Sequence, residues 1–213
     1  MDVAALSLRP ARATVDDGLA FARYLDMSSD HAFRFLLGRR FDHVIAEAFS
    51  HVGHDLSFEY VTMAERGGRV VGIASAYSAE QHRAASDQPL ERAAGWRRWR
   101  MGAFMALAAG LFEFLDRVPD GDHYLQAIAV DEDQRGQGTG SALIAAVEAH
   151  ARDQGSQRLS LDVAASNPDA RRLYERLGMT VEAESPRVLW IPGTSALRMV
   201  KPLRDSFAAE RLT

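Results

Sequence analysis

The chain has 213 residues, of which 47% are hydrophobic and 25% charged, and its formal net charge is −4 at pH 7. This length suits one globular domain with a full core and does not require two. A chain that binds nucleic acid along its length is basic, so the negative charge excludes such a footprint. The lack of cysteine excludes a disulfide framework, and no secretory signal is evident, so a cytoplasmic protein is expected.

The N-terminal part predicts a strand, two helical regions and a hairpin. A strand is expected over residues 6–10, and Thr14 is a suitable cap for the helix that follows. Apolar residues at helical spacing predict a second helical region over 31–52. Two runs rich in β-type residues, 58–64 and 69–77, flank a Gly-Gly pair and predict a β-hairpin.

Residues 80–122 are expected to form a helical insertion before the next strand. Its centre, residues 101–115, is almost entirely apolar but too short for a membrane span, which takes about 20 residues. The basic and aromatic run Trp-Arg-Arg-Trp-Arg over 96–100 is compatible with anionic lipid or nucleic acid. We favour a partly buried helix with an arginine-rich outer face, and so expect no membrane and no nucleic-acid partner. The expected buried stripe comprises Phe104, Leu107, Ala108, Leu111 and Leu115.

Three alternating glycines follow the next predicted strand, residues 125–130. The run Asp-Glu-Asp-Gln-Arg-Gly-Gln-Gly-Thr-Gly over 131–140 connects this strand to a predicted helix over 141–150. A glycine turn leading into a helix leaves backbone N–H groups free at the positive end of the helix dipole, an arrangement that binds phosphate. The glycine spacing differs from a dinucleotide fingerprint, and the lack of lysine excludes a P-loop.

A second pattern begins at residue 158. Alternating apolar residues predict a half-buried strand over 158–164. Asn167 and Pro168 favour the start of a helix, and Gly178 favours its end. One face of that helix carries Ala170, Leu173, Tyr174 and Leu177.

The C-terminal residues predict an antiparallel pair of strands. Residues 188–191 and 196–200 are expected to pair across a turn at Pro192 and Gly193. The remaining residues, 203–213, are expected to form a solvated tail or a short helix.

Together the glycine turn and the Asn-headed helix resemble the GNAT superfamily of N-acetyltransferases. The turn matches Arg/Gln-x-x-Gly-x-Gly/Ala from Arg135 to Gly140, and the helix matches Asn-x-x-Ala-x-x-Leu-Tyr-x-x-x-Gly-Phe from Asn167, with Met179 in place of Phe. The resemblance covers residues 124–181. It implies a single α/β domain over 1–213, with a mixed sheet of about six to seven strands flanked by helices. The two central parallel strands are expected to splay apart after a bulge.

The same resemblance implies acetyl-coenzyme A (acetyl-CoA) as co-substrate. Backbone groups of Ile128, Ala129 and Val130 are expected to pair with its pantetheine arm as an added strand would, and Val130 to polarise the thioester carbonyl. The histidines show no zinc-ligand spacing, so no metal is expected. The other expected cofactor-binding residues are Arg135, Gly136, Gln137, Gly138, Thr139, Gly140, Ser141, Asn167 and Tyr174.

Tyr174 also matches the family's general acid, because a phenol with a pKa of about 10 is protonated at neutral pH. Related enzymes often carry a glutamate base on the strand before the glycine turn. This strand carries Gln126 instead, which cannot usefully accept a proton. His123 is the expected base, with Asp122, Glu65 and bound waters as alternatives.

The resemblance thus predicts an acetyl-CoA-dependent N-acetyltransferase that transfers the acetyl group directly to a primary amine of a small molecule or peptide. The lack of cysteine agrees with a route that has no thiol intermediate. A non-catalytic acyl-CoA-binding sensor is one alternative, because Gln126 replaces a carboxylate. Another is an acyltransferase that uses a longer acyl-CoA, with residues 101–115 lining a tunnel. The apolar insertion also favours a homodimer.

Overall fold

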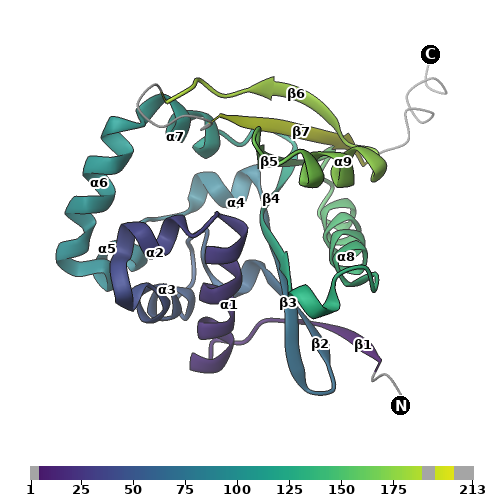
Figure 1. Cartoon of the computed structure of the whole chain (residues 1–213), viewed down its shortest axis with the longest axis horizontal. Coiled ribbons are helices and arrows are strands. Elements are labelled where there is room, and N and C mark those ends of the chain that lie inside the picture. The colour runs from purple at the N-terminus through teal and green to yellow at the C-terminus, as the bar shows by residue number, and fades with distance from the viewer. Residues whose placement is uncertain (1–4, 189–194, 204–213) are drawn as a thin grey trace.

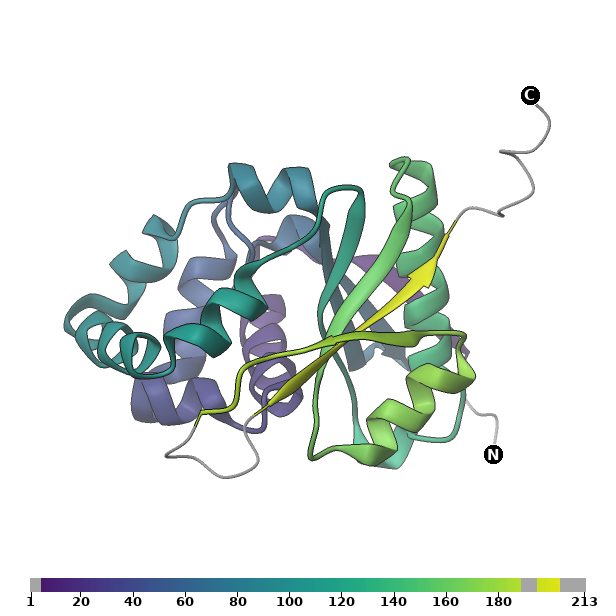
Figure 2. The same ribbon diagram turned by 90° about the horizontal axis from the view of Figure 1, so that it is seen from above.

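The computed structural model describes residues 5–188 and 195–203, in which seven strands form one mixed sheet of order β1-β2-β3-β4-β5-β7-β6. Only β4 and β5 pair in parallel; the other neighbours are antiparallel. Helices α1 and α3 pack on one face of the sheet and α8 on the other (Figures 1 and 2). This is the splayed, helix-flanked α/β sheet expected from the sequence.

The N-terminal hairpin and the cap of the first helix are confirmed. Thr14 Oγ1 accepts the N–H of Asp17 at 3.3 Å, which begins α1. The expected helical region over 31–52 is divided by a 3₁₀ turn at Gly38–Arg40. The bounds are β1 Leu6–Pro10, α1 Val15–Ser28, α2 Ala32–Leu37, α3 Phe41–Phe49, β2 Val61–Arg66 and β3 Arg69–Ser78.

The insertion is helical as expected, but the prediction of one partly buried helix over its centre is wrong in that two helices are found. Two helices meet at Ala108, whose backbone (φ −116°, ψ 30°) interrupts the helix. Of the expected stripe only Ala108 is buried, and Leu107 is 66% exposed. The helices form an arc beside the sheet (Figure 1). They are α4 Ala79–Ala84, α5 Gln88–Ala94, α6 Arg98–Leu107 and α7 Ala109–Asp116.

The two central strands separate as the family resemblance implies. Strand β4 pairs with β5 only from Asp122 opposite Arg158 to Leu125 opposite Leu161. The next residue of β4, Gln126, is a bulge without a partner on β3. Beyond it the two strands diverge. The central elements are β4 Asp122–Val130, α8 Thr139–Asp153, β5 Arg158–Ala164 and α9 Pro168–Arg176.

The C-terminal strand β7, Ala196–Pro202, pairs with β5 on one side and with β6, Thr180–Glu184, on the other. The expected partner strand at 188–191 is not found at Val188, and residues 189–191 lie outside the described part of the chain, as does the expected tail over 204–213. Strand β6 was missed because it is short, mostly exposed and rich in polar residues.

Each face of the sheet has its own core. On the α1 and α3 side the core includes Phe21, Ile45 and Phe49, whereas Leu143 and Met199 belong to the core under α8. Within the described residues, no helix has the length and apolar character that crossing a membrane requires.

Candidate functional site

A cavity of about 710 Å³ opens where β4 and β5 separate. Its walls are the end of α1, the ends of β4 and β5, the glycine turn and α9. Gln137 and Thr139 do not line it. The other expected cofactor-binding residues do: Ile128, Ala129, Val130, Arg135, Gly136, Gly138, Gly140, Ser141, Asn167 and Tyr174.

The glycine turn presents its backbone to this cavity. Gly136 and Gly138 have φ values of +74° and +81°, which side-chain-bearing residues rarely adopt. Gly138 is the N-cap residue of α8, and because it is a glycine no side chain of the cap accepts a hydrogen bond from the first amides of the helix. In the described ranges, the backbone N–H groups of residues 136–141 donate no hydrogen bond. Free amides at the positive end of a fifteen-residue helix make an anion-binding site.

Two arginines add positive charge to the cavity. Arg135 and Arg176 both line it, and neither forms an ion pair with any residue that the structure describes. By contrast, Arg171 of the same helix pairs with Glu175 at 2.8 Å. The sequence interpretation missed Arg176. A signal was present, since Arg176 lies three residues after Leu173 and so shares its helix face.

Tyr174 is positioned by the two ends of α9. Asn167 Oδ1 accepts the N–H of Ala170 at 3.0 Å, and Gly178 ends the helical region with φ +86°. The Tyr174 hydroxyl forms no hydrogen bond within the described chain. Burial raises the pKa of Tyr174 above its ordinary value of 10, so the phenol remains a proton donor at neutral pH.

His123 lies away from this cavity, contrary to its expected role as base. His123 and Ile128 are five positions apart on β4, about 17 Å along the strand. Its side chain is 1% exposed and contacts the His150 ring with a centroid separation of 5.7 Å. Neither ring nitrogen has a hydrogen-bond partner in the described chain. Burial and the nearby His150 lower its pKa to about 4.

The alternative bases are engaged elsewhere. Asp122 accepts two hydrogen bonds from Arg158, at 2.8 and 3.1 Å. Glu65 accepts one from Arg9 at 2.7 Å. Neither carboxylate lines the cavity that contains Tyr174.

A buried ion pair joins the splayed end of β5 to the insertion. Asp162, which lines the cavity, accepts hydrogen bonds from Arg198 at 3.0 and 2.7 Å and from the Tyr124 hydroxyl at 3.0 Å. Arg198, whose side chain is 5% exposed, also donates to the carbonyl oxygens of Phe114 and Arg117, at the end of α7 and just beyond it. Because Arg198 neutralises Asp162, this carboxylate is not a free base.

The turn between α1 and α2 supplies a second carboxylate. Asp30 lines the cavity and, in the described chain, has no ion pair. Asp30 and His31 have φ values of 48° and 65°, unusual for residues other than glycine. Buried Asp26 stabilises this turn, because it bonds His31 Nδ1 and the Arg34 N–H, each at 2.9 Å. The fold thus maintains a strained backbone at the edge of the cavity.

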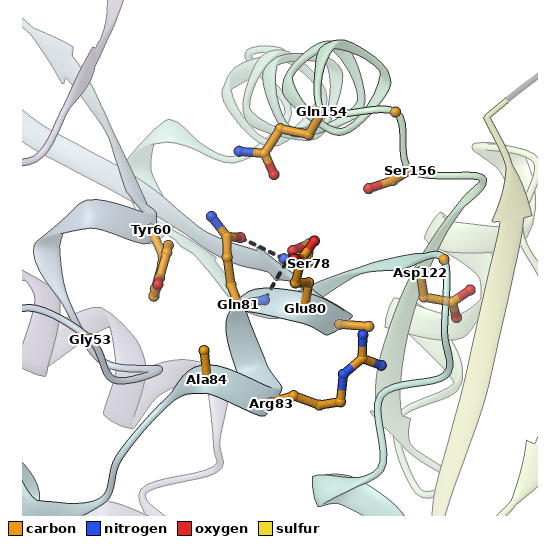
Figure 3. A pocket seen from close by; sticks show the side chains of 13 residues that line it. Gly53, Tyr60, Ser78, Glu80, Gln81, Arg83, Ala84, Asp122, Gln154 and Ser156 are labelled. Carbon is orange, nitrogen blue, oxygen red and sulfur yellow. Dashed lines mark hydrogen bonds between the residues drawn. The ribbon is translucent and has the colours of Figure 1, made fainter.

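A second cavity, of about 640 Å³, lies at the opposite end of β4 (Figure 3). Gln154 and Ser156 extend into it from the end of α8, and Gln81 faces them from α4. It contains neither the glycine turn nor Tyr174, so it is separate from the candidate site. Among residues 5–188 and 195–203, no three acidic or histidine side chains are grouped as a metal site.

Comparison with known proteins agrees with this geometry. Residues 28–179 match the model of the acetyltransferase (GNAT) family. No curated protein matches the chain. Similar solved structures include an acetyltransferase at 27% identity and TM-score 0.66, with 93% of this chain and 100% of the other covered.

Two more distant structures share the fold. An N-acetyltransferase from Staphylococcus aureus Mu50 has 16% identity and TM-score 0.65, with 92% of this chain and 100% of the other covered. A polyamine N-acetyltransferase from Drosophila melanogaster that forms N-acetylagmatine has 18% identity and TM-score 0.56, with 93% and 100% covered. The family match spans more than half of the chain and includes both the glycine turn and Tyr174. The chain therefore belongs to the GNAT family and is an N-acetyltransferase.

Proposed function

We propose that the enzyme transfers the acetyl group of acetyl-CoA directly to a primary amine of a small molecule or peptide. One observation carries this proposal: a single cavity combines helix-terminal amides and two arginines, all without partners in the described chain, with an open strand edge and a half-buried tyrosine. The amides and arginines suit a diphosphate, and the open strand edge suits an extended arm that contains amide groups. The tyrosine suits a leaving thiolate.

The residues present fit the cofactor. The amides of residues 136–141 are free to bind the diphosphate, and Arg135 and Arg176 supply cationic partners for its phosphates. Past Leu125, the edge of β4 that faces β5 is no longer paired. We propose that the amide groups of the pantetheine arm hydrogen-bond to the backbone of this edge, at Ile128, Ala129 and Val130.

Tyr174 is assigned as the general acid. Acetyl-CoA supplies an acyl carbon activated by its thioester when bound. The amine nitrogen forms a bond to that carbon, the carbon–sulfur bond breaks, and the Tyr174 hydroxyl gives its proton to the departing sulfur. The nitrogen then loses its second proton to water, and the Tyr174 phenolate takes a proton back from water. The raised pKa of the phenol keeps this proton in place at neutral pH.

Asp30 is assigned to the acceptor. An amine is protonated at neutral pH and must lose a proton before it can attack. Asp30 lines the cavity and has no ion pair in the described chain, so its carboxylate is free to attract the ammonium group. Asp30 holds the ammonium group while its proton passes to bound water. This proposal replaces His123 as the proton acceptor.

The test is acetyl-CoA turnover against a panel of primary amines. We expect Tyr174→Phe to lower kcat about 10²-fold or more, since general acid catalysis contributes about 10²- to 10⁴-fold. Binding of acetyl-CoA should be unchanged. Tyr60→Phe, which removes a hydroxyl outside this cavity, is the matched control. Unchanged turnover in Tyr174→Phe would remove Tyr174 as the acid.

Two alternatives are an acyltransferase that uses a longer acyl-CoA and a non-catalytic sensor. Residues 101–115 do not line the cavity, so the apolar segment gives no support to a tunnel for a longer acyl chain. Tight acetyl-CoA binding without transfer to any amine would favour a sensor. A cytoplasmic location and a homodimer stay predictions from the sequence.

A further inference from the structure

Helix α6 presents apolar side chains to solvent. No residue of this helix is buried, although its inner face packs partly against the α1 and α3 core through Met101. At 100° per residue, the opposite face combines exposed residues from α6 and the turn before it. We call this face the outward stripe; it consists of Trp96, Trp99, Ala103, Ala106 and Leu107.

Tryptophan exposure is high in this stripe. Trp96 is 68% exposed and Trp99 is 75% exposed, and they are two of the three tryptophans in the chain. Aromatic side chains of this size normally contribute to a core or an interface. Their position next to exposed alanines and a leucine makes a continuous apolar surface, which usually marks a contact site.

In the sequence, arginines flank the outward stripe with no acidic residue among them. Residues 92–112 contain Arg92, Arg97, Arg98 and Arg100 and no Asp or Glu. The adjacent segment 31–41 adds further arginines and is also free of acidic residues. Arg100 Nη2 donates to the Phe35 carbonyl oxygen at 2.9 Å, which connects the two segments. In a chain of net charge −4, this is a local concentration of positive charge.

We propose that the outward stripe and its arginines bind an anionic lipid surface, with α6 lying in the plane of the interface. Tryptophans favour the boundary between headgroups and acyl chains, and arginines attract anionic headgroups. The helix, about 15 Å long, would bury Ala103, Ala106 and Leu107 below them. This proposal replaces the sequence-based expectation of no membrane partner.

A second copy of the chain and a nucleic acid fit the outward stripe less well than a lipid surface does. A second copy related by a twofold axis through the stripe would place arginine against arginine, which is unfavourable. A nucleic acid would engage the arginines and tryptophans, but the aliphatic residues between them would lie against polar sugar and phosphate groups. A lipid surface satisfies both the charges and the aliphatic centre of the stripe.

The experiment is co-sedimentation of the full chain with phosphatidylcholine vesicles, with and without phosphatidylglycerol. We expect binding only to the anionic vesicles, lost at high salt, together with a blue shift of tryptophan fluorescence. Arg97→Gln combined with Arg98→Gln should lower the partition constant roughly 30-fold, since each arginine near an anionic surface contributes about 1 kcal/mol. Trp96→Ala combined with Trp99→Ala should abolish most of the fluorescence shift.

The control is Arg171→Gln combined with Arg172→Gln, which removes the same charge from α9 and should leave vesicle binding unchanged. Equal binding by the α6 and α9 variants would overturn the proposal. So would a failure to bind anionic vesicles, whether accompanied by self-association that Trp99→Ala abolishes or by binding to a single-stranded oligonucleotide.

Discussion

The region that contains the glycine turn and Tyr174, which we call the cofactor half, is stabilised differently from the helical insertion. In β4, α8, β5 and α9, each element begins or ends at a residue with a local reason, such as Gly138, Asn167 or Gly178. The insertion has few buried side chains, and its end is tied to the sheet by Arg198 from a distant strand. The first region depends on local backbone chemistry, whereas the second depends on long-range polar contacts such as this one.

The largest expected effect comes from breaking that contact. Arg198→Met leaves the Asp162 carboxylate buried without its cation and removes the donor to the Phe114 carbonyl oxygen. We expect the free energy of unfolding to fall by about 3–5 kcal/mol, measured by urea denaturation. Adding Asp162→Leu should recover much of this loss. A loss below about 1 kcal/mol would show that the insertion is held in another way.

His123 gives a pH test within the cofactor half. Its pKa is about 4 in the folded chain and 6.5 ordinarily, so between these values the unfolded chain binds more protons. Stability is therefore fully present above pH 6.5 and falls as pH drops toward 4, by about 3 kcal/mol. The free energy of unfolding of His123→Leu, measured by denaturation across this pH range, should not show this decrease.

The same variant separates a structural His123 from a catalytic one. Turnover of His123→Leu at neutral pH should match the wild type, because the ring lies outside the cavity. Parallel stability curves for the two proteins, or a collapse of turnover, would contradict the structural role.

A smaller effect tests the glycine turn. Gly138→Ala places a side chain at φ +81°, which costs about 1–2 kcal/mol, so the KM for acetyl-CoA should rise about tenfold. Gly140→Ala is the control, because its Cβ would meet Val130 Cγ2 at an ordinary 3.9 Å. Equal KM values for the two variants would mean that the turn's conformation does not matter for binding.

The smallest effect concerns the acceptor. Asp30→Asn removes an exposed carboxylate from the cavity edge, and exposed charge pairs contribute about 0.2–1 kcal/mol. The KM for the amine should rise a few-fold at most while that for acetyl-CoA stays constant. Asp42→Asn on α3 removes the same charge elsewhere. If Asp30→Asn leaves amine kinetics unaltered, Asp30 has no role in acceptor binding.

The comparison also explains what could be predicted from sequence. Strand β5 and α9 follow from an alternating pattern, an Asn cap and a glycine stop, all within about twenty residues. The pairing of Asp162 with Arg198 spans 36 positions and has no local signature. The break at Ala108 is similarly invisible, because alanine favours a continuous helix.

Most of the residues predicted to bind the cofactor line one cavity, and their role there stays a prediction. Gly136 and Gly138 indicate a turn in the sequence because their positive φ values are ones that only glycine adopts easily. His123 lies outside this cavity because it stands at the start of β4, a direction along the strand that the sequence alone does not give. Asp30 was overlooked because its place at the cavity depends on how α1 packs beside β4.

Calorimetric titration with acetyl-CoA tests the central claim most directly. The account predicts saturable binding of one acetyl-CoA per chain, weakened at least tenfold by Arg135→Gln combined with Arg176→Gln, since hydrogen bonds to charged groups contribute about 1.5–3 kcal/mol each. Arg171→Gln with Arg172→Gln should bind as the wild type does. Absence of saturable heat, or equal affinity for all three proteins, would contradict the assignment of this cavity.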